Sequence, residues 1–296
     1  MNLLLFNPVA GNGRAARIAP KAESMLKHRV DQLRTVATER PGHAEEIARE
    51  AAGDGVGTIF VLGGDGTVLE AARGVYRSGT ALALLPAGTG NDFRKSLGIP
   101  PRWDDALLFA LEHGPIAVDA GTINGLLFVN ECGAGFDTAT LEYTLLSKRF
   151  TRGKVAYLYG VVRAILDNRP VELEITREDG SAQTRSLTLF GAANGGVIGG
   201  GIPVSPSASA LDGFLDVVTI PSMTRRQLIP ALRLLLKGRI MDVPGAESFR
   251  CKEVAIRGDN LKINVDGEIV RHNAAIFRIE PGALRIHARR DLIKEE

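Results

Sequence analysis

The stretch Thr58-Ile59-Phe60-Val61-Leu62-Gly63-Gly64-Asp65-Gly66-Thr67 decides the fold of this chain. Residues 58–62 are β-branched and apolar, as in a strand that is covered on both faces. Residues 68–73 have helical character, so the glycine-rich turn joins a strand to a helix. Glycine lets the backbone approach a ligand closely, and free amides at a helix N-terminus favour bound phosphate. The stretch therefore predicts an α/β fold with a phosphate-binding edge.

Asp65 places a negative charge in this turn. A bare carboxylate beside phosphates repels them, so it becomes useful if it holds a metal ion or a hydroxyl. The alternative is an ordinary turn in which Asp65 or Thr67 caps the following helix. The pentapeptide by itself leaves both interpretations open.

The composition is that of a globular protein without a nucleic-acid partner. The 296 residues are 45% hydrophobic and 24% charged, enough for one large core or two ordinary ones. A net charge of +2 gives no long-range field toward nucleic acid. Few cysteines and no secretory leader predict a reducing cytoplasm. No apolar run approaches the ~18 residues of a membrane span, so a lipid substrate would be met at the membrane surface.

The first third of the chain alternates strands and helices. The predicted strands are 3–6, 32–37, 58–62 and 81–85, and the predicted helices are 14–27, 43–52 and 68–73. This alternation predicts a parallel sheet with helices on both faces, which binds ligands at the carboxyl ends of its strands. Two more loops at that edge, 7–14 and 86–93, are rich in glycine and polar residues.

The pattern changes after residue 115. Turn signals at Asn124-Gly125, Asp179-Gly180, 258–260 and Asp266-Gly267 separate β-rich runs, and two helices are predicted at 155–166 and 226–236. We therefore predict an α/β nucleotide-binding domain over 1–115, completed by 282–296 if the C-terminal strand and tail return to it. A mainly antiparallel β-sandwich domain for the substrate is predicted over 116–281.

The three strand-end loops resemble those of the diacylglycerol kinase catalytic-domain family, in particular its soluble bacterial lipid kinases. That family has Asn-Pro-x-Ser/Ala-Gly after its first strand, then Gly-Gly-Asp-Gly-Thr, then a Pro-x-Gly-Thr-x-Asn-Asp-Phe turn, as in residues 86–93. The likeness continues through Asn130, 135–137, 199–201, Asp212-Gly213 and 266–268, and so covers nearly the whole chain.

The resemblance implies ATP-dependent phosphorylation of a lipid hydroxyl, with magnesium. By position, the family's nucleotide contacts would fall on Asn7, Thr38, Gly63, Gly64, Asp65, Gly66, Thr67, Val68, Leu69, Glu70 and Thr89. The family's general base would be Glu268, because a carboxylate within reach can accept the proton of a lipid hydroxyl. Taken alone, Glu268 could instead be a hairpin residue that faces water.

Two magnesium sites follow from the same resemblance. One would be formed by Asp212 with the carbonyls of Ser209 and Phe214, although Asp212-Gly213 could also be a simple turn. The other would accompany ATP, and Asp65 is the candidate to hold it.

Several alternatives stay open at this stage. Asn130-Glu131 also fits kinases of NAD, so a kinase of a soluble substrate is the enzymatic rival, and a nucleotide-binding regulatory module is the rival without turnover. The segment 225–239 mixes arginine with leucine, and it could lie on anionic lipid or pack on the sandwich. The sequence leaves a homodimer undecided.

Overall fold

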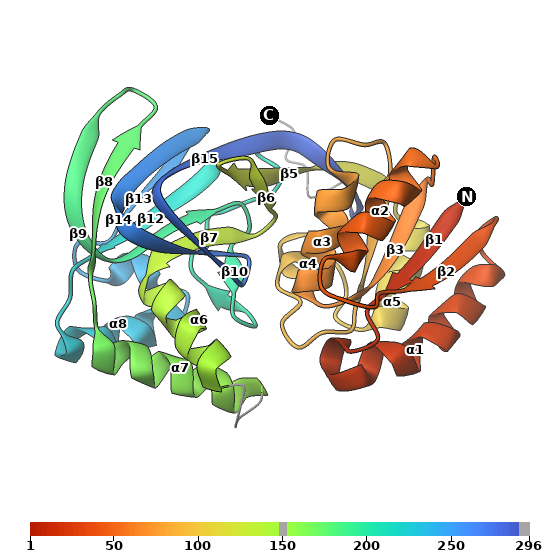
Figure 1. The fold of residues 1–296 in the computed structure, drawn as a ribbon, viewed down its shortest axis with the longest axis horizontal. Coiled ribbons are helices and arrows are strands. Elements are labelled where there is room, and N and C mark those ends of the chain that lie inside the picture. Colours follow the sequence, from red (N-terminus) through yellow and green to blue (C-terminus); the bar gives the residue numbers. More distant parts are fainter. Residues whose placement is uncertain (148–152, 290–296) are drawn as a thin grey trace.

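The computed structural model describes residues 1–147 and 153–289. Its first half contains four neighbouring parallel strands in the order β2-β1-β3-β4 (Figure 1). The strands are β1 (Asn2–Phe6), β2 (Leu33–Ala37), β3 (Thr58–Gly63) and β4 (Ala81–Pro86). The helices are α1 (Ala10–Lys27), α2 (His43–Gly53), α3 (Asp65–Val75), α4 (Phe93–Ser96) and α5 (Trp103–Glu112).

The buried strands explain this half of the fold. All six residues of β4 and five of the six in β3 are buried, as expected for strands covered on both faces. Helix α1 departs from helical geometry at 11–13, where three successive residues have positive φ. The chain therefore forms a loop directly after β1 before the regular part of the helix begins.

The second half is built on antiparallel pairs, as predicted. Its strands are β5 (Pro115–Ile123), β6 (Leu126–Phe128), β7 (Glu131–Gly135), β8 (Val171–Arg177), β9 (Ala182–Ala193), β10 (Val197–Ile198), β11 (Ile202–Pro203), β12 (Leu215–Pro221), β13 (Glu247–Cys251), β14 (Glu253–Val265) and β15 (Glu268–His287). The helices are α6 (Phe136–Ser147), α7 (Gly153–Asp167), α8 (Arg225–Leu236) and the 3₁₀ turn η1 (Ile240–Asp242). A separate core around Phe190 and Phe277 lies inside this half.

Two tight hairpins follow the predicted turn chemistry. Asn124 and Gly125 have φ of 48° and 84°, and Asp266 and Gly267 have φ of 48° and 93°. Both central residues of a type I′ turn need positive φ, which Asn-Gly and Asp-Gly tolerate. The turn expected at 258–260 is wrong, because these residues form an irregularity within the continuous strand β14. Helix α6 was not anticipated either.

Strand β15 joins the two halves. It pairs with β14 at one end, and near its other end Arg285 and Ile286 pair in parallel with Ala81 and Leu82 of β4. The division into 1–115 and 116–281 stays a prediction, and of the proposed C-terminal completion, residues 290–296 lie outside the described residues. Among residues 1–147 and 153–289, no helix combines the length and hydrophobicity of a membrane span.

Candidate active site

The loops after β1, β3 and β4 converge at one edge of the sheet. Asn7 Nδ2 donates to Thr67 Oγ1 at 3.1 Å, which ties the first loop to α3. The backbone N–H groups of Ala87 and Gly88 donate to Gly63 O at 2.8 and 3.1 Å. A side chain at Gly11 would lie 2.1 Å from Ala87 O, so this position requires glycine. The structure thus brings together the three loops that the sequence placed at this edge.

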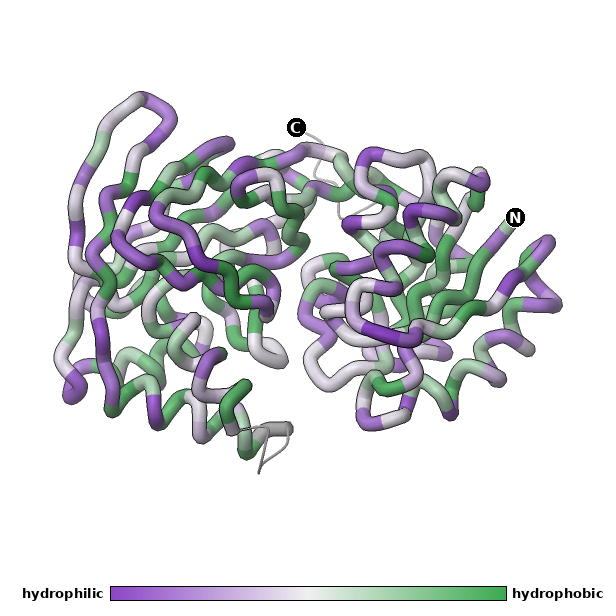
Figure 2. Tube along the Cα trace, in the orientation of Figure 1, coloured by the Kyte–Doolittle hydropathy of each residue, from purple (hydrophilic) through white to green (hydrophobic). Residues whose placement is uncertain are grey.

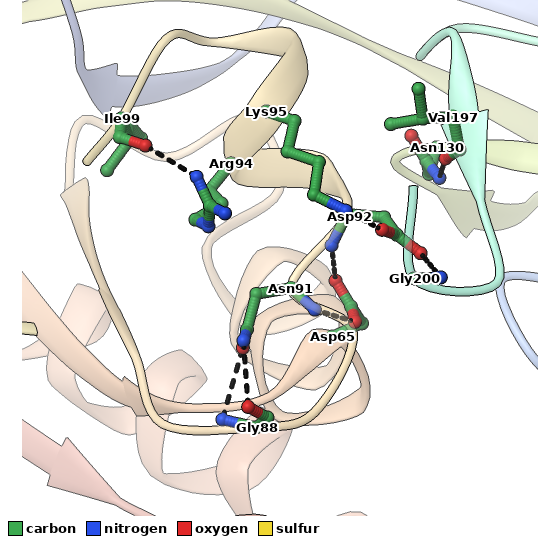
Figure 3. Close-up of polar contacts among 10 residues, drawn as sticks. All are labelled: Asp65, Gly88, Asn91, Asp92, Arg94, Lys95, Ile99, Asn130, Val197 and Gly200. Atoms are coloured by element: carbon green, nitrogen blue, oxygen red, sulfur yellow. Dashed lines mark hydrogen bonds and ion pairs between the residues drawn. The ribbon is translucent and has the colours of Figure 1, made fainter. Parts of the chain in front are cut away.

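Asp65 organises the third loop (Figure 3). Its Oδ2 accepts the N–H of Asn91 and its Oδ1 accepts the N–H of Asp92, both at 2.6 Å. Burial, and then the negative charge of Asp92, raise the pKa of Asp65. The residue at the helix N-cap is Gly64, with no side-chain cap bond, so Asp65 is no cap. Any role of Asp65 toward magnesium or nucleotide stays a prediction.

The other predicted nucleotide contacts differ in how they face this edge. Thr38 is buried at the end of β2, whereas Thr89 is exposed in the third loop. The side chains of Val68 and Leu69 belong to the core, so these residues could meet a nucleotide only through their backbone. Glu70 Oε2 accepts the N–H of Ala44 at 3.1 Å and thereby supports the first turn of α2.

Glu268 reaches the same region from the second half of the chain. It is the first residue of β15, and its Oε2 lies 3.0 Å from Arg73 Nη1 of α3. Arg73 Nε also donates to Leu127 O at 3.1 Å. The Glu268 side chain is 49% exposed and that of Arg73 only 12%, so a mostly buried guanidinium holds an accessible carboxylate. Sequence reasoning missed Arg73, since nothing in its helical surroundings marks it.

A second contact between the halves runs through Asp92. Its Oδ1 lies 2.7 Å from Lys95 Nζ, and its Oδ2 accepts the N–H of Gly200 at 2.7 Å (Figure 3). Gly200 lies in the turn between β10 and β11, and Asn130 Nδ2 donates to Val197 O at the start of the same hairpin. Asp92 is the N-cap residue of α4, and its side chain makes no cap bond there.

Asp266 holds the backbone of residues 129–131, where strand β7 begins. Its carboxylate accepts backbone N–H groups from Val129, Asn130 and Glu131, at 2.6, 3.1 and 2.8 Å. Desolvation outweighs these three bonds and raises the pKa of Asp266 to about 6. Asp266 thereby anchors the Asp266-Gly267 turn, after which Glu268 begins β15.

This raised pKa makes a testable contribution to stability. The pKa of Asp266 is about 6 in the folded protein, and an aspartate in the unfolded chain has a pKa near 3.9. The folded state therefore gains its full stabilisation from the protonated Asp266 below pH 3.9. That contribution is lost as the pH rises through 6. We therefore expect the stability of wild type relative to Asp266→Asn to fall by about 2–3 kcal/mol between pH 4 and pH 7. Thermal unfolding across this range measures the difference.

The matched control is Asp259→Asn, which changes an exposed carboxyl in the irregular part of β14. Its stability curve is expected to run parallel to that of wild type. If the Asp266→Asn curve also runs parallel, the raised pKa of Asp266 is contradicted.

The carboxylate of Asp212, proposed for magnesium, already pairs with the guanidinium of Arg250. Asp212 Oδ1 accepts the N–H of Phe214 at 3.1 Å, and Oδ2 pairs with the guanidinium of Arg250. Arg250 Nε also lies 3.6 Å from the buried carboxylate of Asp216. Within the described part of the chain, no cluster of three or more His, Cys, Asp or Glu side chains could hold a metal. A metal here would rely on Asp212 and the carbonyls of Ser209 and Phe214, and this site stays a prediction.

Asp212→Ala is expected to lower stability by about 1–2 kcal/mol. The variant loses a half-exposed ion pair and one backbone hydrogen bond. If magnesium also binds at this turn, chelation will lower the melting temperature of wild type and leave that of Asp212→Ala unchanged, because ligands of the native state stabilise it by mass action. An equal shift in both proteins would contradict the magnesium proposal.

Glu131 and Cys132 are the first two residues of β7, and both are buried. The Glu131 side chain is 3% exposed, and its burial raises its pKa well above the usual value. Cys132 is fully buried in the core of the second half, and burial raises the pKa of its thiol. Both cysteines are free and buried.

The chain thus combines a glycine-rich turn at the edge of a parallel sheet with an antiparallel second half that brings Glu268 to helix α3. The family model described as diacylglycerol kinase catalytic domain matches residues 2–123. The model described as YegS C-terminal NAD kinase beta sandwich-like domain matches residues 130–288. The chain belongs to the diacylglycerol kinase catalytic-domain family, which confirms the resemblance and the prediction of a kinase.

Relatives of known name cover almost the whole chain. A probable lipid kinase YegS-like of Pseudomonas aeruginosa strain UCBPP-PA14 is 31% identical over 96% of this chain and 93% of its own length. A diacylglycerol kinase of Mycobacterium tuberculosis strain CDC 1551 is 27% identical over 95% and 93%. The crystal structure of a putative diacylglycerol kinase from Bacillus anthracis str. Sterne has a TM-score of 0.82, with 24% identity over 98% of this chain and 96% of that one. At that identity the structural likeness supports the shared fold alone.

Proposed function

We propose that this protein transfers the γ-phosphoryl group of ATP to a hydroxyl of diacylglycerol or a related lipid. The observation that carries the proposal is the pair of Glu268 with Arg73, which holds an accessible carboxylate beside the helix of the glycine-rich turn. The family, and relatives named lipid kinase and diacylglycerol kinase, support the choice of acceptor.

In the proposed reaction, Glu268 accepts the proton of the lipid hydroxyl while that oxygen forms a bond to the γ-phosphorus. The bond between the γ-phosphorus and the bridging oxygen breaks, and ADP leaves with the electron pair. Backbone amides of 63–67 and the loop 86–93 would bind the phosphates, with Asp65 holding that loop in place. Magnesium bound with ATP would supply charge neutralisation at the transferring group.

The rival acceptor within the fold is a soluble one, NAD above all. The loop 86–93 follows the lipid-kinase pattern, whereas the pair Asn130-Glu131 also fits kinases of NAD. An acceptor panel of diacylglycerol, a sphingoid base and monoacylglycerol in detergent micelles, with NAD in parallel, separates the two. We expect phosphate on a micellar lipid, and phosphate on NAD alone would contradict the proposal.

We further propose a cytoplasmic enzyme that meets its substrate at the membrane surface. The two free, buried cysteines are consistent with a reducing compartment. On α8, Leu228 is buried against Val218 and Ile220 while the arginines 225, 226 and 233 are exposed. That helix therefore packs on the sandwich with its charged face outward.

A further inference from the structure

Helix α7 has several large apolar side chains on its outer face. The exposed fractions are 63% for Val155, 63% for Leu158, 47% for Val162 and 52% for Leu166. Their spacing of three and four residues places them on one face of the helix. On the adjoining α6, Leu145 and Leu146 are 40% and 55% exposed.

The inner face of α7 combines small residues with Val161, which is 5% exposed. Ala156 and Ala164 are almost fully buried, and a side chain at Gly160 would lie 2.2 Å from Thr144 Oγ1 of α6. Small residues let the two helices approach closely. The outer face departs from the usual pattern of a surface helix, in which the residues that face water are mostly polar. The outer apolar face therefore needs a partner that the chain does not provide among its described residues.

Positive charge borders this face. Helix α8 packs beside α7, on the same side of the second half (Figure 1). Its sequence contains three arginines and no acidic residue, and Arg225, Arg226 and Arg233 are exposed. Ile229 and Leu236 of α8 are exposed as well, at 50% and 57%. Figure 2 shows hydrophobic and hydrophilic stretches alternating along these helices.

We propose that the outer face of α7, with the end of α6 and the arginines of α8, docks on an anionic lipid bilayer. Apolar side chains beside arginine are the composition of surfaces that lie in the interface of such a membrane. A second copy of the chain fits less well, because a two-fold interface sets each patch against itself and would bring the arginines of two α8 helices together.

Strand β7 links the docking face to the candidate site. Helix α6 begins at Phe136, directly after β7, and Glu131 O of that strand accepts the N–H of Asp266. Glu268 follows two residues later. A bilayer at α7 would therefore lie on the same structural unit as the candidate base. This inference rests on the proposed lipid substrate, and it names the surface by which that substrate is reached.

The test is sedimentation with vesicles of phosphatidylcholine containing phosphatidylglycerol, without substrate. Burying one leucine changes partitioning by about tenfold or more, so the double variant Leu158→Glu/Leu166→Glu is expected to lose at least that factor in vesicle affinity. The matched control is Leu108→Glu, which changes a 39% exposed leucine on α5 of the first half. Both variants should keep the wild-type melting temperature, and only the first should lose vesicle binding.

Activity on a short-chain diacylglycerol dispersed in water separates this inference from the proposed function. We expect the α7 variant to keep that activity and to lose activity on long-chain lipid in vesicles. Vesicle binding equal to wild type would overturn the docking surface, whatever the kinase assay shows. A wild-type dimer that the variant converts to a monomer, with vesicle binding unaffected, would assign the face to a second copy instead. Vesicle binding lost by the variant, with no wild-type activity on any lipid, would support docking while the proposed function failed.

Discussion

Glu268→Gln is expected to lower turnover by about 10²- to 10⁴-fold, the usual contribution of acid–base catalysis. Glutamine keeps the size of the side chain and an oxygen that can accept from Arg73, but it cannot take up the hydroxyl proton. ATP affinity should change little, because the base faces the acceptor. Steady-state kinetics with micellar lipid and calorimetric titration with ATP measure the two quantities separately.

The control for this variant is Glu280→Gln. Glu280 lies on the same strand β15 and pairs with Arg77 at 2.5 Å, just after α3, so it repeats the Arg–Glu contact away from the glycine-rich turn. Its turnover should stay near that of wild type. Full activity in Glu268→Gln would return Glu268 to the role of a hairpin residue. A change confined to KM would mean that it only helps to bind the substrate.

Asp65→Ala is expected to abolish phosphoryl transfer while the protein stays folded. The variant removes the acceptor of two 2.6 Å bonds that hold the backbone of Asn91 and Asp92, and with it the candidate ligand of magnesium. Hydrogen bonds to a charged group contribute about 1.5–3 kcal/mol each, so some loss of stability is expected as well. The protein is expected to stay folded because Leu62 and Leu69, on either side of this turn, are packed in the core.

Turnover and melting temperature should be measured together for Asp65→Ala. The control is Asp54→Ala, which changes an exposed aspartate that follows α2. That variant should match wild type in both measurements. Near-normal turnover in folded Asp65→Ala would remove Asp65 from the mechanism.

The phosphate-binding edge could be predicted because its signals are local. Apolar β-branched runs followed by glycine-rich turns mark buried strands and their loops, and parallel strands bring those loops to one edge. Two hairpins followed from Asn-Gly and Asp-Gly for the same reason. Both central residues of these turns need positive φ, and Asn-Gly and Asp-Gly are the residue pairs that tolerate it.

The contacts between the two halves could not be predicted in this way. Arg73 and Glu268 are 195 residues apart, and Asp92 and Gly200 are 108 apart, so no local pattern connects them. Strand β15 runs without interruption through Pro281-Gly282, a pair that in the sequence suggests a break. The structure accommodates it with a positive φ of 60° at Gly282, whose N–H donates to Asp119 Oδ1 at 2.8 Å.

The face of α7 was also hidden in the sequence. The hydrophobic pattern of 155–166 predicts a helix, but periodicity does not say which face is turned toward the protein. The small residues at 156, 160 and 164 allow the close approach of α7 to α6, while the large side chains at 155, 158, 162 and 166 lie outside.

In the proposed reaction, the γ-phosphoryl group of ATP moves to a lipid hydroxyl. The most direct test gives the protein diacylglycerol micelles, magnesium and NAD, with ATP labelled at either the γ- or the α-phosphate, and extracts the products into organic solvent. We predict label in the organic phase from γ-labelled ATP only, and none after chelation of magnesium. Label in the aqueous phase as phosphorylated NAD, with none in the lipid, would contradict the account.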